Sequence, residues 1–239
     1  MLKNIPNFIT LINLYCGCAA LACIFYEQFV LAFWLLLAGG IADFLDGMVA
    51  RLLNVSSPMG KELDSLADMV SFGAVPGAIF YMLIQKSLSP ESTGSFSLIA
   101  STGFLVTIFA CLRLAKFNID TRQSKNFIGL PTPSCTIFSV GLMLVYDLNS
   151  FNLQGLVLNP FFLFPALIFI SYIMVSTLEM FSFKFDSFKW EGNEIKFIFA
   201  ALSILLIVFL RELAFSIIVL LYILIALGQK VAGKTSTNS

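Results

Sequence analysis

Four aspartates lie close together in a chain that is otherwise strongly apolar. Asp43 and Asp46 come near the end of one hydrophobic run, and Asp64 and Asp68 come near the start of the next. If each run is a helix with about 100° of rotation per residue, each pair occupies one helix face, and the two faces can oppose each other. Carboxylates brought together at the edge of a membrane repel one another and lose hydration, so positive charge must neutralise them.

Divalent cations would supply that charge better than the neighbouring side chains. Arg51 and Lys61 offer at most two positive charges, whereas two divalent ions would balance all four carboxylates, and oxygen ligands suit Mg²⁺ or Mn²⁺. Two such ions close together would orient a diphosphate and stabilise attack at phosphorus. Gly47 would let a nucleotide approach the helix backbone, and Arg51 could pair with a phosphate oxygen.

A simpler interpretation treats the aspartates as exposed helix ends. Asp64 and Asp68 lie near a helix start, where a carboxylate caps free N–H groups and suits the helix dipole. Asp43 and Asp46 lie in the C-terminal half of their run, where negative charge is disfavoured. Their position favours a functional interpretation of the whole group.

The composition places these residues in a membrane protein. Of the 239 residues, 59% are hydrophobic and only 12% are charged. A water-soluble domain could not cover its surface with so few charges. The net charge is zero and no basic tract suggests a nucleic acid as partner. We therefore expect an all-α, polytopic integral membrane bundle.

About eight membrane-spanning helices are expected to position the aspartates. The stretch 195–227 is interrupted only by Arg211 and Glu212, and a single helix of that length would exceed the hydrocarbon core, so we expect two short helices joined by a tight turn. The other expected spans are about 8–26, 29–53, 61–85, 96–118, a run ending near 146, and 160–180. Together they predict one transmembrane catalytic domain over residues 1–228, with a disordered cytoplasmic tail over 229–239.

The basic residues predict the orientation. If both termini are cytoplasmic, only Lys86 and Arg211 of the 14 Lys and Arg residues fall on the outer side. This orientation places all four aspartates at the cytoplasmic ends of the second and third spans. We expect a protein of the bacterial inner (cell) membrane whose active site faces the cytoplasm.

The spacing of the acidic residues resembles a known signature. The pattern D-x2-D-G-x2-A-R-x8-G-x3-D-x3-D is met at every position, by Asp43, Asp46, Gly47, Ala50, Arg51, Gly60, Asp64 and Asp68. It resembles the signature of the CDP-alcohol phosphatidyltransferases, integral membrane enzymes that transfer a phosphatidyl group from CDP-diacylglycerol to an alcohol and release CMP. Signature and flanking motifs cover residues 6 to about 135.

The resemblance implies a role for each of these residues. In that family the first three aspartates bind two metal ions and the fourth also acts as a base toward the acceptor hydroxyl. Asp43, Asp46 and Asp64 would thus be ligands, and Asp68 would be ligand and base. The positions that resemble contacts to CDP-diacylglycerol are Gly47, Arg51, Ser57, Gly60, Asn7 and Thr10. An ordinary helix start explains the Pro6–Asn7 pair almost as well.

Flanking residues point to the acceptor alcohol. The segments SFGAVP at 71–76, RLAKFN at 113–118 and GLPTP at 129–133 look like the phosphatidylserine synthase branch of the family. L-Serine needs a partner for its carboxylate, which Arg113 or Lys116 could provide. Its ammonium group needs acceptors, which Ser71, Asn118 and free backbone carbonyls could provide. The two basic residues could instead extend to lipid headgroups.

Other functions are weighed against this one. Glycerol 3-phosphate or inositol phosphate as acceptor would demand more basic groups, which Arg122 and Lys125 could add. A cation-coupled transporter is the alternative from another class. Transporters usually hold their ion sites near the bilayer midplane, often between repeats, whereas these aspartates are expected near one membrane surface and the sequence shows no repeat. The expected partners are CDP-diacylglycerol, L-serine, membrane lipid and, by resemblance, a second copy of the chain in a homodimer, with no nucleic acid.

Overall fold

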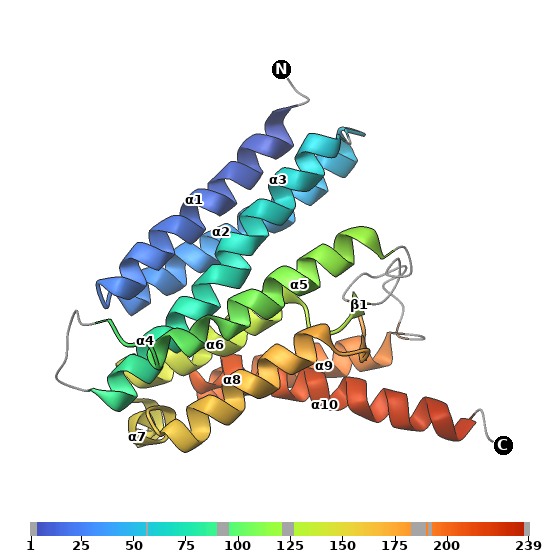
Figure 1. Ribbon diagram of the computed structural model, residues 1–239. Helices are drawn as coiled ribbons and strands as arrows, with labels where there is room; N and C mark the ends of the chain where they lie inside the picture. Colours follow the sequence, from blue (N-terminus) through green and yellow to red (C-terminus); the bar gives the residue numbers. More distant parts are fainter. Residues whose placement is uncertain are drawn as a thin grey trace.

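The protein is a bundle of helices with one small two-stranded sheet (Figure 1). A computed structural model describes residues 4–55, 57–89, 96–120, 127–182, 190 and 193–236. The hydrophobic core is shared by several helices and includes the third helical span, where side chains such as Ile79 and Phe80 are almost completely buried.

Two long antiparallel helices begin the chain. α1 (Ile5–Phe25) has Pro6 in its first turn, where the missing N–H costs nothing. A tight turn containing Glu27 at φ 57° leads into α2 (Phe29–Leu52). The two helices pack along their lengths, and α1 also packs against the third span (Figure 1).

The third span changes its winding along its length. α3 (Pro58–Asp68) begins at the cap residue Ser57, whose Oγ accepts a hydrogen bond of 3.0 Å from the Gly60 amide. The π-helical segment η2 (Met69–Ala74) follows, and then α4 (Val75–Leu88). π-helical turns are rare and occur frequently at functional sites. In Figure 1, the α3 part of this span lies beside α1 and α2, whereas its α4 part lies among the other helices.

The remaining elements complete the bundle around α4. They are η3 (Ala100–Phe104), α5 (Leu105–Ile119), α6 (Thr132–Leu148), η4 (Ser150–Asn152), α7 (Gln154–Val157), α8 (Pro160–Val175), α9 (Glu194–Leu210) and α10 (Leu213–Ser236). Strands β1 (Phe127–Ile128) and β2 (Glu179–Met180) pair antiparallel and join the chain before α6 to the chain after α8. The sequence pattern predicts neither the strands nor the short helices η4 and α7.

The helices confirm the predicted helical membrane fold. Five of the described segments are long and apolar enough to cross a membrane: 5–25, 29–52, 58–88, 100–119 and 213–231. α6 and α8 are shorter apolar helices. α9 and α10 are separated at Arg211, which has φ 51°, as the interruption at 211–212 predicts. α10 continues past residue 228, where the expected tail begins.

Polar contacts join the turns that are expected on the outer side of the membrane. Lys86 Nζ lies 2.7 Å from Glu27 Oε1, and Ser150 Oγ donates a hydrogen bond of 2.7 Å to Glu212 Oε2. Burial raises the pKa of Glu212, but its backbone hydrogen bond, the Ser150 hydroxyl and Arg211 together hold it below the usual value. These contacts lie at the ends of the helices opposite to the aspartates.

Candidate active site

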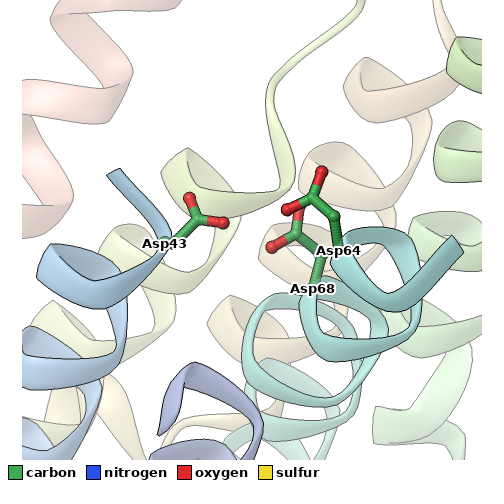
Figure 2. A group of neighbouring side chains, drawn as sticks. All are labelled: Asp43, Asp64 and Asp68. Carbon is green, nitrogen blue, oxygen red and sulfur yellow. The ribbon is translucent and has the colours of Figure 1, made fainter. Parts of the chain in front are cut away.

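Three of the four aspartates converge between α2 and α3. Asp43 on α2 faces Asp64 and Asp68, which lie one turn apart on α3 (Figure 2). One carboxylate oxygen from each residue lies within 4.8 Å of the others. We call Asp43, Asp64 and Asp68 the carboxylate cluster.

The carboxylate cluster forms no direct ion pair among the described residues, although Arg113 on α5 interacts electrostatically with Asp68. Asp68 Oδ1 is buried and has no hydrogen-bond partner there. The three side chains are half-buried. Carboxylates in such surroundings are costly without a counter-charge, and oxygen ligands in this number and spacing suit a divalent cation. The donor set therefore fits Mg²⁺ or Mn²⁺.

Asp46 lies beside the carboxylate cluster but is not part of it. Its side chain is only 6% exposed, and its Oδ2 accepts a hydrogen bond of 2.6 Å from Thr10 Oγ1. The Thr10 hydroxyl also lies 3.0 Å from the Pro6 carbonyl in its own helix. α1 thus contributes directly to the position of a signature carboxylate.

A cavity of about 250 Å³, lined in part by polar side chains, adjoins the cluster at the ends of α1, α2 and α3. We call it the signature cavity. Asp46 and Asp64 line it, so two of the four aspartates face this space. Five of the six residues expected to contact CDP-diacylglycerol also line it: Asn7, Thr10, Gly47, Ser57 and Gly60.

The two signature glycines border the signature cavity in different ways. A Cβ atom on Gly47 would meet nothing within 4 Å, so a ligand could approach the α2 backbone there. A Cβ atom on Gly60 would lie 3.0 Å from Asn7 Oδ1 and 3.1 Å from Ser57 Oγ. Gly60 thus lets the start of α3 come close to α1. The sixth expected residue, Arg51, is exposed, and its Nε donates a hydrogen bond of 2.9 Å to the Gly47 carbonyl.

A second cavity, of about 420 Å³, brings together Arg113 and Lys116. We call it the arginine cavity; its other lining residues are Ile119 and Asp120 at the end of α5, Ile128 of β1, and residues 174–177 at and just after the end of α8. Arg113 is only 7% exposed. Its Nη1 lies 3.4 Å from Thr132 Oγ1, its guanidinium carbon lies 5.7 Å from the centre of the Phe117 ring, and its Nε has no partner among the described residues.

Burial distinguishes Arg113 from Lys116. A basic side chain that extends to lipid headgroups stays exposed at its tip, as Lys116 does. Arg113 instead carries a buried charge with an unsatisfied N–H, which favours an anionic ligand in the arginine cavity.

Ser71 and Asn118 do not line the arginine cavity. Ser71 is buried against α1, and its Oγ donates a hydrogen bond of 3.1 Å to the Asn13 carbonyl. Asn118 connects α5 to α3, because its Nδ2 donates to Ser65 Oγ at 2.8 Å and its carbonyl accepts from Lys61 Nζ at 3.1 Å. In this structure both side chains join helices.

Residues 3–175 match the sequence model of the CDP-alcohol phosphatidyltransferase family. The chain belongs to this family. The match includes α1 to α8 and all eight residues of the predicted signature. The membership that the spacing predicts is therefore confirmed.

Three relatives of the chain are named CDP-diacylglycerol–serine O-phosphatidyltransferase. The protein of Helicobacter pylori is 39% identical over 137 residues, which are 56% of this chain and 55% of that protein. The protein of Bacillus subtilis is 35% identical over 146 residues, 61% of this chain and 78% of the relative. The protein of Saccharomyces cerevisiae is 40% identical over 120 residues, 46% of this chain and 40% of the relative. The match thus spans about half of the Helicobacter relative.

An apolar groove that the sequence does not predict leads to the carboxylate cluster of this family member. It has a volume of about 450 Å³ and is formed by α2, α6, Phe72 and Phe215. Asp43 lines the groove, and the other lining residues are apolar side chains, Gly40 and Thr136. One wall of the cluster is therefore accessible to a hydrocarbon chain.

The sequence also gives little sign of the wall formed by residues 174–177. Ser176 and Thr177 follow an apolar run and carry no recognisable motif. They reach the arginine cavity because the ribbon of β1 and β2 folds the end of α8 back: the Gly129 amide donates to the Leu178 carbonyl at 2.8 Å, and the Leu130 amide donates to the Ile173 carbonyl at 3.1 Å.

Proposed function

We propose that this protein transfers a phosphatidyl group from CDP-diacylglycerol to the hydroxyl of L-serine, giving phosphatidylserine and CMP. The observation that carries the proposal is the convergence of Asp43, Asp64 and Asp68 beside the signature cavity. Family membership and the names of the relatives support the same reaction.

Two divalent cations, Mg²⁺ or Mn²⁺, are the proposed cofactors. Asp43, Asp64 and Asp68 would hold them together with Asp46, which adjoins the cluster through the signature cavity. When bound, such ions supply positive charge to a diphosphate and to the phosphorus under attack.

The donor is proposed to span the signature cavity and the apolar groove. Its cytidine diphosphate would occupy the space beside Gly47, where the α2 backbone is open, with the exposed Arg51 near its phosphates. Its acyl chains would lie in the groove between α2 and α6, which Asp43 also lines. The reacting diphosphate then lies where the polar and apolar spaces meet, at the carboxylate cluster.

The acceptor is proposed to enter from the arginine cavity. Arg113 would bind the serine carboxylate, because its guanidinium is buried and not fully paired. Lys116, exposed on the same cavity, would add positive potential. In this structure Ser71 and Asn118 form hydrogen bonds to Asn13 and Ser65. To bind the serine ammonium group, as proposed from the sequence, their side chains would have to move away from these partners.

Asp68 is the proposed general base. Its carboxylate accepts the proton of the serine hydroxyl while the serine oxygen forms a bond to the β-phosphorus. The bond from that phosphorus to the bridging oxygen breaks, and the electron pair leaves with CMP. The buried, unpartnered Oδ1 of Asp68 is the atom proposed to take the proton.

The proposed setting is the bacterial inner membrane, with termini and active site in the cytoplasm. The asymmetry of the basic residues supports this orientation. Residues 1–228 would form one catalytic domain and 229–239 a tail. A homodimer surrounded by membrane lipid is proposed from family resemblance alone.

One assay tests the reaction and its alternatives. Detergent-solubilised protein is mixed with CDP-diacylglycerol and Mn²⁺, and CMP release is measured with L-serine, glycerol 3-phosphate or inositol phosphate as the added alcohol. We expect release with serine only, and none from Asp68→Asn. Release with another alcohol would reassign the acceptor. No release with any alcohol, from protein that transports cations into vesicles, would favour the transporter.

A further inference from the structure

The helix that carries Asp64 and Asp68 changes its winding immediately after Asp68. The segment η2, Met69–Ala74, is π-helical, so each of its turns takes about one residue more than an α-helical turn. In an unbroken α-helix, Gly73 would lie about 140° around the axis from Asp68. The additional residue reduces this angle to about 40°. The π-helical segment therefore turns Asp68 toward the side of the helix on which Gly73 lies.

The Gly73 side of the helix packs tightly against α5. A Cβ atom on Gly73 would lie 3.3 Å from the Cβ of Ala110. A Cβ atom on Gly77, one turn farther along, would collide with the hydroxyl of Thr107. The spacing between the two helices is thus fixed by small residues, and Thr107 lies between both glycines.

This packing brings Asp68 level with Arg113. α5 runs antiparallel to α4, and Gly73 contacts Ala110. Asp68 lies before Gly73 in the chain and Arg113 lies after Ala110, so both lie on the same side of this contact along the helix axes. The side chains of Asp68 and Arg113 interact electrostatically. Asp68 is therefore placed between the cluster partner on α2, Asp43, and the guanidinium on α5.

Two carbonyls of the widened turn accept hydrogen bonds from neighbouring helices. Thr107 Oγ1 donates to the Gly73 carbonyl at 2.9 Å. Thr136 Oγ1 lies 3.3 Å from the Phe72 carbonyl, but it also lies 3.2 Å from the Thr132 carbonyl of its own helix, so its single proton is shared. Buried carbonyls without a partner are costly. Thr107 is thus the stronger support of the π-helical segment.

We propose that Thr107 is a positioning residue, which acts through the Gly73 carbonyl to hold the π-helical segment and, with it, the direction of Asp68. Thr107 need not touch a substrate. Without its hydroxyl, the Gly73 carbonyl loses its partner from α5, and a return to α-helical winding would rotate Asp68 by about 100° relative to Gly73. The consequence for turnover rests on the proposed function, whereas the consequence for cation binding rests only on the position of Asp68 in the carboxylate cluster.

Three variants of the full chain test this role. Thr107→Val keeps the shape of the side chain and removes the donor, and Thr107→Ser retains the donor. Thr102→Val is the matched control, because Thr102 lies earlier on the same helical segment, is exposed, and donates only to the Ile99 carbonyl of its own helix at 2.7 Å. Mn²⁺ affinity is measured by electron paramagnetic resonance of the free ion, and kcat and KM are measured for both proposed substrates.

We expect Thr107→Val to weaken Mn²⁺ binding and to lower kcat by about tenfold each, the lower end of the cost of losing a group that supports metal ligands. Thr107→Ser should stay within about twofold of the unchanged protein for both quantities, as should Thr102→Val. Similar values for Thr107→Val and Thr102→Val would overturn the proposal, and so would a Thr107→Ser variant as impaired as Thr107→Val.

Two further readouts keep the test decisive. If Thr107→Val does not fold, Thr107→Ala replaces it, and the same comparison with Thr107→Ser applies. If the unchanged protein transfers nothing to serine, the proposed function fails, and Mn²⁺ affinity alone decides whether Thr107 positions Asp68.

Discussion

The hydroxyl of Thr10 donates a hydrogen bond of 2.6 Å to Oδ2 of Asp46. This bond joins α1 to α2, and both residues line the signature cavity with Gly47. Asp46 is thereby held beside the proposed nucleotide site, while Asp43 belongs to the carboxylate cluster. Two aspartates from the same helix face thus have different surroundings, and α1 accounts for the difference.

Removing the Thr10 hydroxyl should weaken the use of CDP-diacylglycerol, the proposed phosphatidyl donor, more than the use of serine, the proposed acceptor. We expect Thr10→Val to raise the KM for CDP-diacylglycerol by at least about tenfold, because a hydrogen bond to a charged group contributes roughly 1.5–3 kcal/mol. The KM for serine should change little. Steady-state kinetics with each substrate varied in turn measure both values, and Thr10→Ser serves as the control that keeps the bond. Equal increases for both substrates would show that Thr10 supports the fold and not the donor site.

The sequence predicts the helices and the acidic site because both depend on local patterns. Apolar runs define the spans, and the interruption at Arg211 and Glu212 separates α9 from α10 as expected. The signature spacing brings Asp43, Asp64 and Asp68 together through helical periodicity. Each of these features can be found from residues that are near one another in the chain.

Features that depend on contacts between distant segments could not be predicted. Rotation of 100° per residue assigns Ser71 to the face of Asp68, but the π-helical segment begins at Met69, and Ser71 turns to α1. The donors that support this segment, such as Thr107, come from other helices. The same holds for the wall of the arginine cavity at 174–177, since the two-stranded ribbon that positions it pairs residues far apart in the chain.

Burial predicts different roles for the two basic residues of the arginine cavity. We expect Arg113→Ala to raise the KM for serine by at least about tenfold while the KM for CDP-diacylglycerol changes little, because loss of a charge-assisted contact costs roughly 1.5–3 kcal/mol. Lys116→Ala should have a much smaller effect, since Lys116 is exposed. Arg113→Lys is the informative partner variant, as it keeps the charge but not the planar fork. Equal effects on both substrates would remove Arg113 from the serine site.

The orientation can be tested with single cysteines in a protein whose five native cysteines have been replaced by serine. A cysteine at Asn152, exposed in η4, should react with an impermeant thiol reagent added outside intact cells. A cysteine at Glu62, exposed on α3, should react only after the membrane is permeabilised. Labelling of Glu62→Cys from outside would reverse the proposed topology and move the active site to the other face.

Cation binding should stabilise the fold through the carboxylate cluster. At about 100 times its dissociation constant, Mn²⁺ should stabilise the unchanged protein by about 2.7 kcal/mol. This gain, measured as a shift in thermal unfolding, should disappear in Asp43→Asn and in Asp64→Asn. Chelation with EDTA should abolish CMP release, and added Mn²⁺ should restore it. An identical thermal shift in Asp43→Asn would place the cation elsewhere.

A final prediction separates the two proposed roles of Asp68. Its carboxylate lies in the cluster with Asp43 and Asp64, and its Oδ1 is buried without a partner. Asp68→Asn keeps the size of the side chain and one oxygen, but it cannot take the proton of the serine hydroxyl. We expect turnover to fall by at least ~10²-fold, the usual scale for loss of a general base.

Metal-dependent binding of CDP-diacylglycerol supplies the comparison that identifies the base. Asp43→Asn and Asp64→Asn remove charge from residues proposed only as ligands, so donor binding should be weakened strongly in both. Asp68→Asn should weaken donor binding much less, because its oxygen still reaches the cluster while its proton acceptor is lost. Equilibrium binding in the presence of Mn²⁺, measured beside turnover for the three variants, tests this difference. Near-normal turnover in Asp68→Asn, or donor binding lost as fully as in the other two, would exclude Asp68 as the base.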